Sequence, residues 1–210
     1  MKILYLTNNS ISYSLSEWLK KIGEDVFVYD KKLSKSIIFN LKPDFIISYN
    51  YGYLIPKDIL SLFPKKNVIN LHISLLPWNR GSHPNVWSFI DETPKGVSIH
   101  LIDEGIDTGD ILVQKEVFID ENKHTLESSY KLLHKKIQSL FKDNWYHIKI
   151  LNIEPKPQQG KGSIHYKKDF EKIKHLLGKE GWNIPILEFK KRVYKWREEN
   201  GNKIRQKNHF

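Results

Sequence analysis

The first 120 residues alternate short strand-like segments with helix-like segments, and this order constrains the fold more than any other feature of the chain. Apolar, β-branched and aromatic residues gather in residues 2–7, 26–29, 44–49 and 67–72. Residues 12–22, between the first two of these segments, have the apolar periodicity of a helix. A repeated β-α-β order is typical of a parallel sheet covered on both faces. We therefore expect an α/β fold with a Rossmann-like, mostly parallel sheet and helices on both faces.

The pattern continues after a loop rich in Pro and Gly at residues 77–84. A short helix is expected over 85–90, followed by two strands over 97–102 and 111–119 that a tight turn joins. A long helix with one apolar stripe is expected over 125–150.

A run containing Pro155, Pro157, Gly160 and Gly162 then interrupts the helical pattern. We predict a catalytic domain over 1–153 and a short, mainly helical, basic extension over 154–210.

The composition excludes several classes of protein. The 210 residues include no cysteine, so disulfides, thiolate metal sites and cysteine nucleophiles are absent. The longest apolar runs, such as 45–47, are too short to cross a bilayer. The first residues resemble a strand of the mature protein and not a secretion signal. We therefore expect a cytoplasmic protein that does not bind membranes.

The positive charge is concentrated near the C-terminus. Residues 1–154 contain 19 Lys and Arg against 18 Asp and Glu, whereas residues 155–210 contain 15 against 6. Such a segment can attract a phosphorylated small molecule or a nucleic acid, or it can simply be a solvated surface. Because 30 of the 34 basic residues are Lys, and Arg is the residue suited to gripping phosphate, we favour a solvated surface over a nucleic-acid site.

In an open parallel sheet, ligands bind beyond the carboxyl ends of the strands, which here means the loops 8–12, 50–56, 72–84 and 103–110. The first of these loops contains no glycine, and no P-loop motif occurs, so dinucleotide and P-loop nucleotide sites are not expected. No G-x-S-x-G nucleophile motif is present.

The histidines His72, His83 and His100 lack the spacing of a zinc site. We therefore expect no metal.

Three polar residues in these loops are candidates for catalysis. Asn70 and His72 lie two positions apart on a strand and therefore face the same side. Together they offer an oxyanion donor and a group that exchanges a proton. Asp107, in the turn 104–110, can orient the imidazole if the turn approaches it. The residues alone leave open a satisfied hydrogen-bond pair at Asn70 and His72 and an ordinary turn at Asp107.

Four sequence blocks, in order, resemble the folate-dependent formyltransferase family: 70–77 (NLHISLLP), 80–81 (RG), 96–100 (GVSIH) and 103–111 (DEGIDTGDI). The family includes the glycinamide ribonucleotide, methionyl-tRNA and sugar N-formyltransferases. The resemblance is clear over residues 40–120, weaker before them, and poor beyond 150.

The resemblance implies an enzyme that takes the formyl group from N10-formyltetrahydrofolate, without a metal. It places the catalytic residues at Asn70, His72 and Asp107. It also implies a folate pocket built largely from backbone groups, for which the contacts would be Gly52, Tyr53, Leu54, Ile102, Asp103, Glu104 and Gly105.

For the acceptor, the resemblance favours the sugar N-formyltransferases, because the runs 77–89 and 162–169 are similar to theirs. The turn at 8–10 differs from the phosphate-binding turn of the ribonucleotide enzyme, and the methionyl-tRNA enzyme is much longer. A dTDP-linked amino-deoxy sugar of polysaccharide biosynthesis is the expected substrate, and a homodimer is expected. Formylation of glycinamide ribonucleotide or methionyl-tRNA and a non-catalytic RNA-binding module are the alternatives.

Four residues are predicted to contact the acceptor: Ser74, Trp78, Arg80 and Gly81. Arg80 borders the catalytic strand and can fork onto a phosphate, but it can also anchor the loop. Trp78 and Trp87 can line the acceptor cleft or can simply be packed.

Overall fold

The computed structural model describes the backbone of residues 1–207 and the side chains of residues 1–200. A six-stranded sheet forms its centre, with the strand order β2-β1-β3-β4-β6-β7. The strands are β1 (Lys2–Leu6), β2 (Asp25–Tyr29), β3 (Phe45–Tyr49), β4 (Val68–His72), β6 (Gly96–Leu101) and β7 (Ile111–Glu116). The first four are parallel, and β6 pairs antiparallel with β4 and with β7. The expected α/β fold is therefore confirmed, with one strand running against the others.

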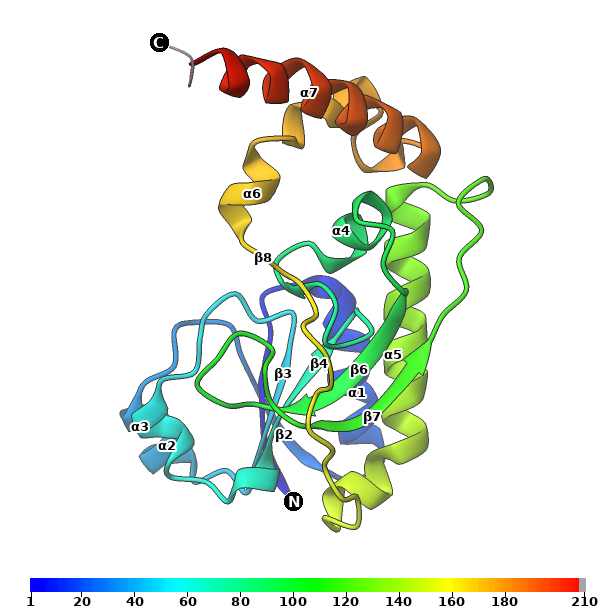
Figure 1. The fold of residues 1–210 in the computed structure, drawn as a ribbon. Helices are drawn as coiled ribbons and strands as arrows, with labels where there is room; N and C mark the ends of the chain where they lie inside the picture. Colours follow the sequence, from blue (N-terminus) through cyan, green and yellow to red (C-terminus); the bar gives the residue numbers. More distant parts are fainter. Residues whose placement is uncertain (208–210) are drawn as a thin grey trace.

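Helices cover both faces of this sheet (Figure 1). Helix α5 is the longest element, and it lies with α1 on the opposite face from α2 and α3. The helices before the C-terminal segment are η1 (Ser10–Ser12), α1 (Tyr13–Lys21), α2 (Lys35–Leu41), α3 (Lys57–Leu60), η2 (Lys65–Asn67), α4 (Pro84–Ile90) and α5 (Leu126–Lys149). None of the helices in the described part of the chain is long and apolar enough to cross a bilayer.

Alternation along the strands builds a separate apolar core on each face. In β1, Ile3 and Tyr5 belong to the core under α1 and α5, whereas Leu4 and Leu6 belong to the core under α2 and α3. All four side chains are fully buried. Strands buried on both faces explain the nearly continuous apolar runs in the sequence.

Helix α3 is a single turn. Pro56 has an extended backbone conformation and caps the helix, which ends at Leu60. Beyond Leu60, the N–H groups of Leu62 and Phe63 donate to the carbonyls three residues back, so the chain continues in tight turns to Pro64.

The C-terminal segment passes back across the sheet before it becomes helical. Lys156 forms a bridge with Ile111 of β7. The two-residue strands β5 (Arg80–Gly81) and β8 (Ile164–His165) then pair in parallel. The segment ends in α6 (Lys167–Glu171), η3 (Lys174–Asn183) and α7 (Ile186–Lys207).

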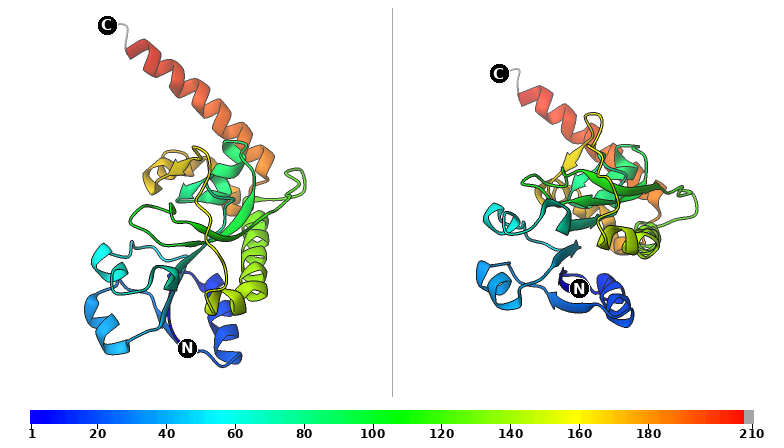
Figure 2. Two further views of the ribbon diagram at one scale, coloured as in Figure 1. Left: turned by 60° about the horizontal axis from the view of Figure 1, so that its bottom comes forward. Right: turned by 90° about the horizontal axis from the view of Figure 1, so that it is seen from below.

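These helices gather beside α4, and α7 extends away from the rest of the chain (Figures 1 and 2). Phe170, Ile184 and Val193 belong to the same buried cluster as the sheet residues over α1 and α5. The predicted domain boundary after residue 153 stays a prediction. The hydrophobic core includes residues from both sides of this boundary.

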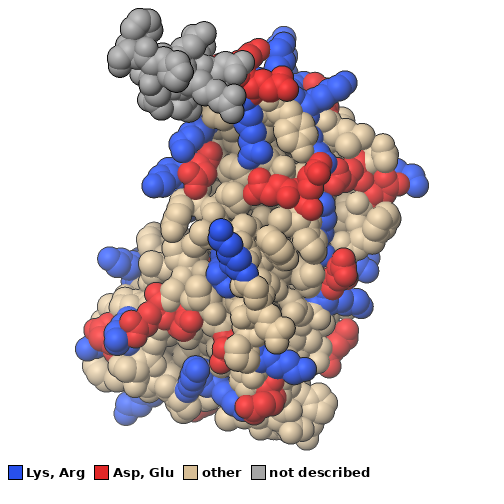
Figure 3. All heavy atoms as spheres, viewed as in Figure 1, with Lys and Arg blue, Asp and Glu red and all other residues tan. Residues whose placement is uncertain are grey.

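Charged side chains of both signs are intermixed on the face shown in Figure 3, including the part formed by the C-terminal helices. Lys190 lies 2.8 Å from Glu121, Arg192 lies 2.8 Å from Glu180, and Arg197 lies 3.4 Å from Asp91. Carboxylates therefore neutralise part of the excess positive charge locally.

Candidate active site

Asn70 and His72 lie at the carboxyl end of β4, in the middle of the sheet. The residues between and before them, Leu71 and Ile69, point into the core under α5, so alternation directs Asn70 and His72 to the other side. Asp107 belongs to the turn between β6 and β7 and has a positive φ of 52°. The antiparallel pairing places the end of β6, Leu101, opposite Ile69 at the start of β4, and the following loop folds back so that Asp107 reaches Asn70.

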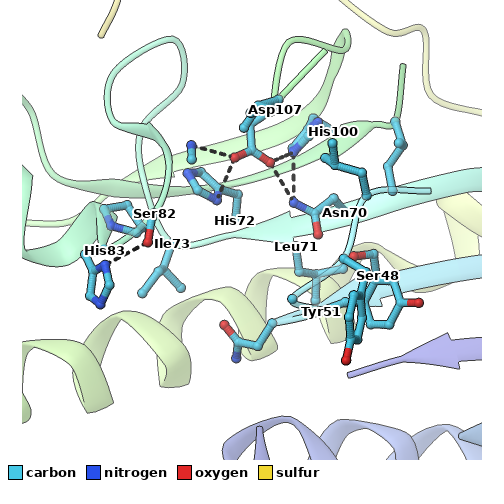
Figure 4. A pocket seen from close by; sticks show the side chains of 18 of the residues that line it. Ser48, Tyr51, Asn70, Leu71, His72, Ile73, Ser82, His83, His100 and Asp107 are labelled. Carbon is cyan, nitrogen blue, oxygen red and sulfur yellow. Dashed lines mark hydrogen bonds and ion pairs between the residues drawn. The ribbon is translucent and has the colours of Figure 1, made fainter. Parts of the chain in front are cut away.

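The carboxylate of Asp107 is the centre of the cluster (Figure 4). Its Oδ1 accepts a hydrogen bond from Asn70 Nδ2 at 3.0 Å, and its Oδ2 accepts one from the backbone N–H of Gly81 at 2.8 Å. His72 Nδ1 lies 3.6 Å from Oδ2. The amide, the imidazole and the carboxylate predicted from the sequence therefore converge.

The surroundings of Asp107 keep it ionised. Burial alone would raise the pKa of this carboxyl, but His72, His100 and the Gly81 N–H hold the pKa well below its usual range. The side chain therefore remains a carboxylate across the neutral range.

The ring of His72 is held from both sides. Its Nε2 donates to the backbone carbonyl of Asn79 at 2.9 Å, so this nitrogen carries a proton. Nδ1 faces Asp107 and is the nitrogen left to gain or lose a proton. Asn79 is fully buried and is itself fixed, because its amide donates to Thr93 Oγ1 at 2.7 Å. The two ring nitrogens of His72 therefore have different partners, the Asn79 carbonyl and the Asp107 carboxylate.

His100 is a further member of the cluster that the sequence did not assign a role. Its Nδ1 lies 2.8 Å from the carbonyl of Leu101, and its Nε2 lies 3.2 Å from Asn70 Nδ2 and 3.4 Å from Asp107 Oδ1. The amide of Asn70 is therefore held by two partners. His100 lies within one of the blocks that resemble the family, and this was the available signal.

A cavity of about 570 Å³ opens over these side chains. On one side it is bounded by the segment 50–55, and on the other by 81–84 and 165–167. Six of the seven predicted folate contacts line it, namely Gly52, Tyr53, Leu54, Ile102, Asp103 and Gly105. The seventh, Glu104, is not part of the lining, and its carboxylate pairs with Lys57 at 2.7 Å. Their contact with folate stays a prediction.

Of the four predicted acceptor contacts, Gly81 alone lines the cavity. Ser74 is buried, and its carbonyl accepts a hydrogen bond from Ser98. Trp78 is partly exposed but lies outside the lining. After β4 the chain turns away from the cavity, so Ser74 and Trp78 lie outside its lining. The sequence spacing does not indicate the direction in which the chain leaves the strand.

Arg80 anchors the loop and does not face the cavity. Its guanidinium donates to Gln158 Oε1 from Nε at 3.0 Å and from Nη2 at 2.7 Å. Gln158 in turn donates to the carbonyls of Asp107 and Gly109 at 2.8 and 2.9 Å. The loop-anchor alternative therefore describes Arg80 in this structure, because the pairing of β5 with β8 places it beside the C-terminal segment.

The C-terminal segment contributes His165, Tyr166 and Lys167 to the cavity; the sequence indicates only the region of His165 as a further acceptor candidate. His165 stacks on Trp87, with ring centroids 4.1 Å apart, and its Nε2 lies 2.8 Å from Asp91 Oδ2. Trp87 is 5 % exposed and outside the lining, so it is packed and does not line the cleft. The similarity of 162–169 to the sugar enzymes was the signal for this side. Within residues 1–207 no cluster of His, Asp and Glu suits a metal ion.

The family model described as formyl transferase matches residues 24–143, which include Asn70, His72 and Asp107. The chain belongs to the formyl transferase family. It is 38 % identical over 169 residues to methionyl-tRNA formyltransferase of Thermodesulfovibrio yellowstonii, covering 78 % of this chain and 49 % of the relative. The match to the enzyme of Clostridium tetani is 33 % over 178 residues, covering 81 % and 53 %. The chain thus spans about half the length of these curated relatives.

Two solved structures are similar over more of their length. The formyltransferase PseJ from Anoxybacillus kamchatkensis is 43 % identical, with a TM-score of 0.82, over 90 % of this chain and 97 % of that one. It was solved in complex with UDP-4,6-dideoxy-4-formamido-L-AltNAc and tetrahydrofolate. A 4-N formyltransferase from Francisella tularensis is 26 % identical, with a TM-score of 0.68, over 82 % and 79 %.

Proposed function

We propose that this formyl transferase moves the formyl group of N10-formyltetrahydrofolate to the primary amine of a nucleotide-linked amino-deoxy sugar. The observation that carries the proposal is the convergence of Asn70 and His72 on the carboxylate of Asp107, at the base of a cavity bounded by two different chain segments. One side can hold the folate donor and the other the amine acceptor.

The cluster can perform each step of such a transfer. The acceptor nitrogen attacks the formyl carbon, and the bond to N10 breaks as the new carbon–nitrogen bond is completed. The Asn70 amide stabilises the oxyanion that forms between these steps. The attacking nitrogen gives its proton to Nδ1 of His72, and the imidazolium so formed, oriented by Asp107, delivers this proton to N10 of the leaving tetrahydrofolate.

For the amide to reach the oxyanion, one N–H of Asn70 must leave His100 Nε2, which lies 3.2 Å away in this structure. The second N–H keeps the hydrogen bond to Asp107. Asp107 therefore orients Asn70 and His72 while the Asn70 amide binds the reacting oxygen.

The choice of a sugar acceptor is supported by the similarity to PseJ, which spans 97 % of that chain. The relatives named methionyl-tRNA formyltransferase make methionyl-tRNA the second candidate. UDP is a second candidate for the nucleotide beside the predicted dTDP, because the sugar in the PseJ structure is linked to UDP. A role in polysaccharide biosynthesis, a homodimer and a cytoplasmic location stay predictions.

An acceptor comparison tests the proposal. The release of tetrahydrofolate from N10-formyltetrahydrofolate is followed with UDP- and dTDP-linked amino sugars, methionyl-tRNA and glycinamide ribonucleotide, each against a reaction without acceptor. We expect turnover with at least one nucleotide-linked amino sugar. Turnover confined to methionyl-tRNA or to the ribonucleotide would refute the choice of acceptor and leave the chemistry intact.

A further inference from the structure

Three aromatic rings lie together at the side of the cavity formed by the C-terminal segment. They belong to His83, just before α4, to Phe170 in α6 and to Trp182 in η3. His83 lies 4.0 Å from Phe170 between ring centroids, and Phe170 lies 5.4 Å from Trp182. The planes differ by 21° and 11°, so the three rings are nearly parallel.

The third distance defines the arrangement. His83 and Trp182 lie 6.2 Å apart with planes 14° from parallel. Rings on opposite faces of Phe170 would be separated by about 7 Å, twice the contact distance of stacked rings. His83 and Trp182 therefore lie on the same face of Phe170, side by side. We call these two rings the aromatic shelf.

The shelf is supported from behind and open in front. Phe170 is 1 % exposed and backs both rings, whereas Trp182 is 43 % exposed. The hydroxyl of Ser82 lies 2.7 Å from His83 Nδ1 and fixes the orientation of that ring. His83 lines the cavity and Trp182 lies outside its lining, so the shelf extends from the cavity outward.

Charge at the shelf suits a phosphorylated ligand. Lys167 lines the cavity, lies three residues before Phe170 on α6 and makes no ion pair with any residue of the described chain. Burial lowers the pKa of His83, and the charges of Lys167 and Lys174 lower it further, whereas Glu171 opposes them. The His83 ring therefore stays neutral, and the ammonium group of Lys167 provides the positive charge on this side of the cavity.

We propose that the aromatic shelf of His83 and Trp182 stacks the pyrimidine base of the nucleotide-linked acceptor and that Lys167 binds its phosphates. The inference rests on the proposed function and names the part of the acceptor that this side of the cavity holds. Planar bases stack on aromatic side chains whatever their hydrogen-bonding pattern. The folate rings would lie at the other side, beside the segment 51–55.

The test uses UDP and dTDP alone as probes, so that it does not depend on formyl transfer. Their binding is measured by calorimetry for the wild type, Trp182→Ala, Trp182→Phe and Trp78→Ala. Trp78 is the matched control, because its exposure of 37 % is similar to that of Trp182 but it does not belong to the ring cluster of His83 and Phe170. We expect Trp182→Ala to weaken binding about 10- to 100-fold, the range for loss of one stacked base. Trp182→Phe and Trp78→Ala should bind nearly as the wild type does.

Inorganic pyrophosphate is the second probe, and its binding should depend on Lys167 and not on Trp182. Equal binding of UDP by Trp182→Ala and the wild type would overturn the shelf. Tighter binding of an oligoribonucleotide ending in CCA than of UDP would overturn its assignment to a nucleotide sugar. Binding of UDP through Trp182 without formylation of any amino sugar would refute the proposed function alone.

Discussion

The two sides of the cavity are built in different ways. The catalytic cluster consists of side chains on β4, β6 and the turn after β6, which the central sheet holds in place. The side formed by residues 81–84 and 165–167 comes from segments that are far apart in the sequence and are joined by a pair of two-residue strands. The difference teaches that the sheet positions the polar cluster rigidly, whereas the side proposed to bind the acceptor depends on segments attached to the sheet.

The largest effect should follow from changes in the catalytic cluster. We expect Asn70→Ala, His72→Ala and Asp107→Ala each to lower kcat at least about 100-fold, because each removes an oxyanion donor or a proton-transfer group. Binding of tetrahydrofolate should change little, which calorimetry measures.

Asp110→Asn is the control for Asp107, because Asp110 lies in the same turn and pairs only loosely with Lys65, at 3.6 Å. A kcat near that of the wild type in Asp107→Ala would show that this residue only shapes the turn.

Gly81 links the two sides, and its replacement should affect both. A Cβ at Gly81 would lie 2.3 Å from the carbonyl oxygen of His165, at a φ of +85°. We expect Gly81→Ala to lower the free energy of unfolding by about 2–3 kcal/mol and to change kcat and the acceptor KM together. Denaturant titration and steady-state kinetics measure these effects.

Gly160→Ala is the matched control for Gly81, because its φ is +83° and no atom lies within 4 Å of the added Cβ. It should cost about 1 kcal/mol and leave kinetics unchanged. Equal losses for the two variants would mean that the contact with His165 has no effect.

A buried imidazole beneath the sheet provides a contrast with His72. His134 lies 2.5 Å from the hydroxyl of Tyr49, and burial lowers its pKa to about 3. The unfolded chain binds this proton below about pH 6.5, so the folded state loses stability as the pH falls from about 6.5 toward 3. Between pH 7 and 5 the loss from this group should be about 2 kcal/mol.

Chemical denaturation at both pH values measures this loss, and His134→Gln should remove it. His147→Gln, which changes an exposed histidine on the same helix, should keep it. The same pH dependence in His134→Gln and the wild type would contradict the assignment.

The smallest effect is expected from the charge at the acceptor side. Lys167→Gln should raise the acceptor KM about fivefold and leave kcat unchanged, with a smaller difference at high salt. Lys168→Gln is the control, because Lys168 lies on the same helix but outside the cavity lining, with its ammonium over the ring of Tyr166. A decrease in kcat for Lys167→Gln would show that this lysine takes part in the chemical step. It would contradict the separation between the catalytic cluster and the acceptor side.

The catalytic cluster was predictable because its members lie in sequence blocks that keep their order. Alternation on one strand predicts only that Asn70 and His72 face the same side, and the resemblance to the family supplied the roles of both and of Asp107. The long helix α5 was also predicted to within one residue at each end, because its apolar stripe is regular.

The acceptor side was not predictable to the same degree. Arg80 was expected at the acceptor and instead contacts Gln158, which lies 78 residues away in the sequence. Two-residue strands such as β5 and β8 have no periodic pattern, so the sequence gives no signal that they pair. Trp182 has no role in any motif and becomes a candidate only through its distance to His83.

The most direct test of the account is a single turnover with N10-formyltetrahydrofolate and a UDP-linked 4-amino-deoxy sugar, with the N-formyl product detected by mass spectrometry. We predict product from the wild type and from Trp182→Phe, and at least a 100-fold slower reaction from Asp107→Asn. Equal rates for the wild type and Asp107→Asn would contradict the account. So would the absence of product with every nucleotide-linked amino sugar from a folded protein that binds tetrahydrofolate.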